Sequence, residues 1–99
     1  MTEGRARVLL NLENVDQFQS GEILIAPYTD PGWTPLFSLA KAVVTENGGL
    51  LSHAALVARE FGKPAVLAVE AATSQIQSGD LVRVDGQSGH VEILSRAQK

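Results

Sequence analysis

The stretch Gly48–Val66, GGLLSHAALVAREFGKPAV, is the most informative part of this chain. Two glycines precede a serine and a histidine, and a helical pattern follows that ends in glycine and proline. Ser52 is a good N-cap, which predicts a helix from His53 to Phe61. Its apolar residues recur three and four positions apart and predict one buried stripe: Ala54, Val57, Ala58 and Phe61. The stretch therefore places His53 where a glycine turn enters a helix.

Short apolar runs before and after this helix predict strands. They are Arg7–Leu12, Glu22–Ala26, Lys41–Glu46, Ala65–Val69, Asp80–Asp85 and His90–Leu94. The last two are joined by the turn residues Gly86–Gly89, which indicates a β-hairpin. Thr34 as N-cap, with Pro35 at the first helical position, predicts a short helix that ends at Ala40. We therefore predict a compact α/β fold, in which a mixed sheet is packed with short helices and ends in a C-terminal β-hairpin.

The size and composition of the chain suit one globular domain over residues 1–99, with a disordered tail from about residue 95. The absence of cysteine excludes disulfides and thiolate metal sites. The net charge is −3 and the basic residues are scattered singly, so we expect no nucleic-acid partner. No apolar run is long enough for a signal peptide or a membrane span, so we expect a cytoplasmic protein without a membrane partner.

The segment Pro27–Pro35, PYTDPGWTP, holds three of the four prolines. Proline fixes its own φ and restricts the residue before it, so this segment should be stiff. Trp33 within it has two interpretations. It either covers the edge of the core or forms a docking surface for another domain.

His53 is expected in the first turn of its helix, among free backbone N–H groups and at the positive end of the helix dipole. That environment disfavours an imidazolium, and a neutral imidazole is a nucleophile. An anion bound to the ring would lie at a helix N-terminus, where phosphate binds readily. The pattern therefore suits reversible attack of a histidine nitrogen on a phosphoryl group. From the pattern alone, however, the favoured interpretation is an ordinary polar residue beside a helix cap.

Two other kinds of site fit the sequence poorly. A Ser-His-Asp hydrolase is not indicated, because Ser52 and His53 are adjacent and the G-x-S-x-G pattern is missing. A metal site is not indicated either, because His53 and His90 share no ligand spacing and have no cluster of carboxylates beside them. His90 is expected to be structural or exposed.

Four blocks of the sequence resemble the mobile, swivelling phosphohistidine domain of PEP-utilising enzymes. They are Gly4–Val8, Gly21–Phe37, Val43–Val66 and Gly79–Leu94, which occur in the family's order and cover almost the whole chain. The block TDPGWTPLF is similar to that of phosphoenolpyruvate synthase and rifampicin phosphotransferase members. Leu51 departs from several members, which have threonine before the Ser-His pair.

The resemblance implies a swivelling β/β/α phosphohistidine domain in which His53 is the phosphorylated, catalytic residue. We expect Gly49 and Ser52 to bind the phosphate, with Thr45 and Gly48 in support. The domain would be an incomplete phosphotransferase component that binds no cofactor itself. Magnesium and ATP or PEP would lie on its partners, an ATP-grasp-like nucleotide-binding domain and a PEP/pyruvate or other acceptor domain. These partners would be parts of the same enzyme or separate chains.

An alternative function stays open at this point. The chain could be a non-catalytic interaction module that keeps the fold and docks through the Trp33 loop.

Overall fold

A computed structural model describes residues 2–47 and 53–96 of the chain. Its strands form one six-stranded sheet in the order β4-β3-β2-β1-β5-β6. The strands are β1 (Thr2–Val8), β2 (Ile23–Ala26), β3 (Ala42–Thr45), β4 (Ala65–Val66), β5 (Leu81–Asp85) and β6 (His90–Ser95). The α-helices are α1 (Thr34–Leu39), α2 (His53–Phe61) and α3 (Ala72–Gln75), and the 3-10 helices are η1 (Leu12–Gln17) and η2 (Pro31–Trp33).

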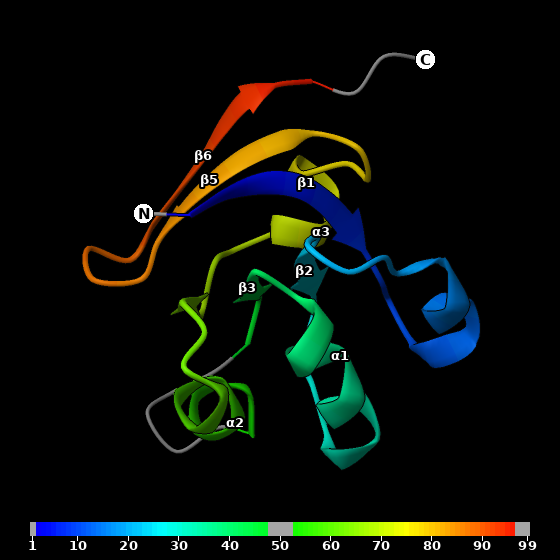
Figure 1. Cartoon of the computed structure of the whole chain (residues 1–99). Helices are drawn as coiled ribbons and strands as arrows, with labels where there is room; N and C mark the ends of the chain where they lie inside the picture. Colours follow the sequence, from blue (N-terminus) through cyan, green and yellow to red (C-terminus); the bar gives the residue numbers. More distant parts are fainter. Residues whose placement is uncertain (1, 48–52, 97–99) are drawn as a thin grey trace.

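The sheet is mixed, as predicted. Strands β1, β2, β3 and β4 pair in parallel, whereas β5 pairs antiparallel with both β1 and β6. The β5–β6 pair confirms the predicted C-terminal hairpin. Figure 1 shows β1, β5 and β6 arching over β2 and β3, with α1 and α2 beyond these two strands. The result is the expected α/β fold of packed strands and short helices.

Strands β2 and β3 separate two apolar cores, and every one of their residues is buried. Alternate side chains of a strand point to opposite faces. On one face, Leu24 and Val43 pack with residues of α1 and α2 in a cluster that we call the helix-side core. On the other face, Ile23 and Val44 pack with residues of β5 and α3. Burial on both sides explains why these strands have nearly continuous apolar sequences.

Two strand predictions were wrong in their extent. The apolar run at 7–12 was predicted as a strand, but β1 covers Thr2–Val8. Leu9 instead packs into the core on the helix side, and the next apolar residues lead into η1. The predicted strand Ala65–Val69 also stops early, at Val66, because Ala68 has a left-handed φ of 59° that no extended strand can contain.

The bounds predicted for the helix after residue 52 agree with the structure better than those of the two strands. Helix α2 has the predicted bounds, and Gly62 follows it with φ 67°. The amides of Gly62 and Lys63 donate to the carbonyls of Arg59 and Ala58, which is the Schellman arrangement that ends a helix. The predicted buried stripe was wrong at Phe61, whose side chain is 39% exposed. No helix within the described ranges is long and apolar enough to cross a membrane.

The start of α1 also differs from prediction. Thr34 was predicted as the N-cap, but it has helical backbone angles (φ −52°, ψ −42°) and α1 has no side-chain cap. The capping side chain lies further upstream, where Asp30 Oδ1 accepts the amide of Gly32 at the start of η2. The Thr34 hydroxyl is therefore not used as a cap, and it lies against His53.

Strand β6 continues to Ser95, one residue further than predicted. Arg96 then donates from Nη1 to the carbonyl of Gln75 (2.7 Å) and to the carboxylate of Asp80 (3.2 Å). The rest of the predicted tail, residues 97–99, lies outside the described residues.

Candidate functional site

His53 is the first residue of α2, and its half-buried imidazole is contacted on three sides. The hydroxyl oxygen of Thr29 lies 2.7 Å from Nδ1. The hydroxyl oxygen of Thr34 lies 3.3 Å from Nε2. The ring of Phe37 meets the imidazole edge to face, with centroids 5.8 Å apart. Both ring nitrogens therefore have a hydroxyl partner, and an aromatic side chain limits rotation of the ring.

Thr29 comes from the segment between β2 and α1, and Thr34 is the first residue of α1. The backbone of the segment between these two elements is tied to the chain that follows β3, because the amide of Asn47 donates to the carbonyl of Pro27 at 2.9 Å. The turn of η2 is closed by the Asp30 cap and by the Trp33 amide, which donates to the Asp30 carbonyl at 2.9 Å. A loop fixed in this way holds its side chains in place before any ligand arrives.

The position of His53 at the start of α2 fits an anion site. The first amides of a helix have no intrahelical acceptor and lie at the positive end of the dipole. A negatively charged group attached to the ring would be stabilised there. The predicted phosphate-binding residues Gly49 and Ser52 and the supporting Gly48 lie outside the described residues, so their roles stay predictions.

Thr45 and Glu46, at the end of β3, have local partners. The buried hydroxyl of Thr45 donates to the carbonyl of Asn47 at 2.6 Å, which stabilises the turn that leads toward residue 48. The Glu46 carboxylate accepts hydrogen bonds from the hydroxyl (2.6 Å) and the amide (2.9 Å) of Thr73. These two hydrogen bonds hold the pKa of Glu46 below its usual value. Both side chains thus stabilise the chain at the end of β3, and the supporting role of Thr45 at the site stays a prediction.

Trp33 lies in the helix-side core and is only 2% exposed. Its ring contacts that of Tyr28 at 6.4 Å between centroids. This burial agrees with the interpretation of Trp33 as a cover over the core. It offers almost no surface for docking, which disfavours the alternative of an interaction module that binds through this side chain.

The sequence interpretation singled out His53 but missed the side chains that contact it. Thr34 was assigned to a helix cap, and neither Thr29 nor Phe37 was assigned a role at the site. The available signal was the presence of two hydroxyl residues within a proline-rich segment. It could not identify the contact, because Thr29 and His53 are 24 positions apart in the chain.

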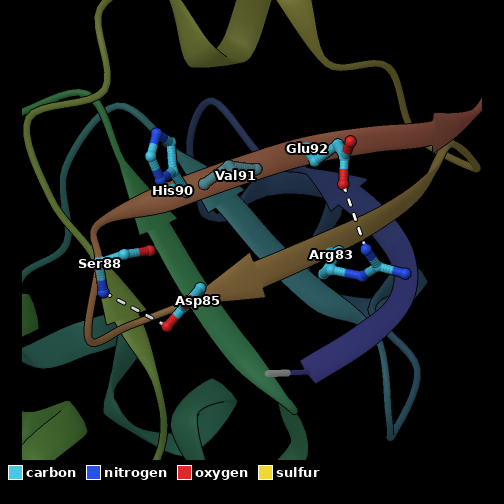
Figure 2. Close-up of a pocket in the computed structure, with 6 residues that line it drawn as sticks. All are labelled: Arg83, Asp85, Ser88, His90, Val91 and Glu92. Atoms are coloured by element: carbon cyan, nitrogen blue, oxygen red, sulfur yellow. Dashed lines mark hydrogen bonds and ion pairs between the residues drawn. The ribbon is translucent and has the colours of Figure 1, made fainter.

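A second polar surface lies on the hairpin. A hollow of about 400 Å³ is formed by β5, β6 and the turn between them. Figure 2 draws the residues that line it. Its charged groups already have partners, since Arg83 pairs with Glu92 at 3.4 Å and the Asp85 carboxylate accepts the amide of Ser88 at 3.3 Å. His90 is exposed there, as predicted. In residues 2–47 and 53–96, no three or more His, Asp or Glu side chains form a group that could hold a metal ion.

Comparison with known proteins identifies the family. The family model for the mobile domain of PEP-utilising enzymes matches residues 18–89, a range that includes His53 and all three side chains on its ring. This chain belongs to that family. The mobile-domain chain is 52% identical over 94 residues to a rifampicin phosphotransferase of Bacillus cereus, covering 95% of this chain and 11% of the relative. It is 50% identical over 91 residues to a phosphoenolpyruvate synthase of Aquifex aeolicus, covering 89% of this chain and 11% of the relative.

A solved structure supports the same assignment. The mobile domain superposes on Enzyme I (nEIt) with a TM-score of 0.70 and 34% sequence identity, covering 82% of this chain and 34% of that structure. The chain spans about a tenth of the length of the curated relatives named above. In the relatives, therefore, a region of this kind is one part of a larger phosphotransferase or synthase.

Proposed function

We propose that this domain is a phosphoryl carrier, in which His53 is transiently phosphorylated. The observation that carries the proposal is the arrangement of its imidazole, which lies at the start of α2 between two hydroxyls in a domain of the PEP-utilising family. A histidine nitrogen is a competent nucleophile toward phosphorus when its lone pair is free. The helix N-terminus would stabilise the charge of the attached phosphoryl group.

The geometry favours Nε2 as the attacking atom. Nδ1 faces the short contact with Thr29, a residue that is 9% exposed, so a phosphoryl donor would have to displace a buried hydroxyl to reach it. Nε2 faces the longer contact with the half-buried Thr34. In the proposed step the Nε2 lone pair forms the N–P bond. The bond from phosphorus to the oxygen of the leaving group breaks, and that oxygen keeps the electron pair. Transfer to an acceptor oxygen then restores the free imidazole.

The donor and the acceptor belong to the partners in this proposal. We assign one site to an ATP-grasp-like nucleotide-binding domain and the other to a PEP/pyruvate or other acceptor domain, in the same enzyme or as separate chains. Magnesium and ATP or PEP would bind to those partners. Gly49 and Ser52 would bind the phosphate on this domain, with support from Thr45 and Gly48. A cytoplasmic location stays a prediction.

Intact-protein mass spectrometry tests the proposal. Incubation with a cognate nucleotide- or PEP-dependent partner should add one acid-labile phosphoryl group of about 80 Da. His53→Ala should abolish the adduct. The chain has two histidines, so His90→Gln is a matched control that should keep it. An adduct that persists in His53→Ala, or the absence of an adduct with every partner, would refute the proposal.

A further inference from the structure

The contact between Thr29 and His53 carries more information than the other contacts of the ring. It is the shorter of the two hydroxyl contacts, 2.7 Å against 3.3 Å, and it involves the more buried threonine. Thr29 belongs to the segment whose backbone is tied down at Pro27 and closed by the Asp30 cap. Its hydroxyl therefore has little freedom to leave Nδ1.

The protonation of a neutral imidazole decides which nitrogen can attack. One ring nitrogen carries a proton and the other carries an available lone pair. If Nε2 is the nucleophile, the proton must be on Nδ1. A threonine hydroxyl can accept a hydrogen bond through its oxygen lone pairs. The Thr29 oxygen is at the distance required to accept this proton.

We propose that Thr29 is the positioning residue that selects the reactive form of His53. Its hydroxyl oxygen accepts the Nδ1 proton, keeps the neutral ring in the Nδ1–H tautomer and directs the Nε2 lone pair outward. This inference rests on the proposed carrier function. When Nε2 attacks phosphorus, Nδ1 keeps its proton and the ring becomes positively charged. The hydrogen bond to Thr29 is then charge-assisted and stronger.

Thr34 has the opposite role in this scheme. Its hydroxyl donates to the Nε2 lone pair in the resting domain, and this bond must break before Nε2 can attack. The longer distance of 3.3 Å agrees with a contact that is given up readily. The two threonines therefore give a matched pair of variants that remove the same group from opposite sides of one ring.

The tautomer is measured first, without any phosphoryl donor. Long-range ¹H–¹⁵N NMR on the unphosphorylated, ¹⁵N-labelled chain at a pH where His53 is neutral reports which nitrogen bears the proton. The wild type and Thr29→Ser should show Nδ1–H as the major form. Thr29→Val, which has the same shape without the hydroxyl, should lose this preference. Thr34→Val should keep it. A wild-type ring with the proton mainly on Nε2 would overturn the inference, even if the valine variant fails to fold.

The rate of His53 phosphorylation is measured second, in single-turnover experiments with the cognate partner. Loss of a hydrogen bond to a charged group predicts a decrease of about ten- to a hundred-fold in Thr29→Val. Thr29→Ser should restore a rate near that of the wild type. An unchanged rate and tautomer in Thr29→Val would refute the positioning role and leave the carrier function intact. If the wild-type chain forms no adduct, the carrier function is refuted. The tautomer measurement needs no phosphoryl donor, so it still tests the role of Thr29 separately.

Discussion

Phe37 provides a test of how the fold supports the site. Its side chain is fully buried in the helix-side core, and its ring contacts those of His53 at 5.8 Å and Phe61 at 6.3 Å. Replacement by leucine removes both edge-to-face contacts and part of the buried apolar surface. The loss of apolar surface and of packing should cost about 1–1.5 kcal/mol. Each aromatic pair contributes about 0.5–1.5 kcal/mol beyond this loss. Because His53 and Phe61 are both partly exposed, we expect the two pairs together to contribute about 1–2 kcal/mol.

Phe18→Leu is the matched control, because Phe18 is buried in the same core and none of the ring contacts in the described residues involves it. Urea unfolding should show that Phe37→Leu lowers the free energy of unfolding by about 1–2 kcal/mol more than Phe18→Leu. For a domain of this size the difference in Tm is roughly 5–15 °C. Phe37→Leu should also slow phosphorylation of His53, since the imidazole loses one of its supports. Equal destabilisation by the two variants would refute the contribution of the ring contacts.

Three further predictions concern the backbone, a carboxylate and an ion pair. Ala68 has a left-handed φ of 59°, which glycine adopts without strain, so Ala68→Gly should stabilise the domain by about 0.5–1 kcal/mol in thermal unfolding. Ala72→Gly is the control, because glycine within α3 should destabilise the domain. The lowered pKa of Glu46 gives stability that is present above the unfolded-state pKa and is lost as the pH falls through the folded-state pKa. In acid titrations monitored by circular dichroism, Glu46→Gln should therefore lose less stability on acidification than the wild type; an identical pH profile would contradict this. Asp80 is fully buried, whereas its partner Arg96 is largely exposed. In urea unfolding, Asp80→Ala should therefore lower the free energy of unfolding by about 2–4 kcal/mol, and Arg96→Ala should lower it by less than about 1 kcal/mol. Equal losses in the two variants would contradict this effect of burial.

The parts of the fold that the sequence predicted well depend on local signals. The end of α2 follows from Gly62, whose positive φ and Schellman hydrogen bonds involve only the preceding turn. The β5–β6 hairpin follows from turn residues between two short alternating runs. In both cases the residues that determine the structure are adjacent in the chain, so a sequence pattern contains them.

The parts that were missed depend on distant residues. Strand β1 has polar residues along most of its length, and it forms because β2 and β5 pair with its two edges. The side chains on His53 were missed for the same reason, since Thr34 is 19 positions away and Thr29 is 24. Neither spacing corresponds to a helix or strand period. Only the folded chain, in which the loop after β2 passes beside the start of α2, shows which hydroxyl faces which ring nitrogen.

The most direct test of the carrier function is a chase experiment. The domain is phosphorylated with a ³²P-labelled donor and its partner, separated from both, and then mixed with the acceptor domain and acceptor substrate. If His53 carries the phosphoryl group, the label should leave His53 and appear in the product without further donor. Label that stays on the domain, or that reaches the product only when the original donor is present, would contradict a carrier role for His53.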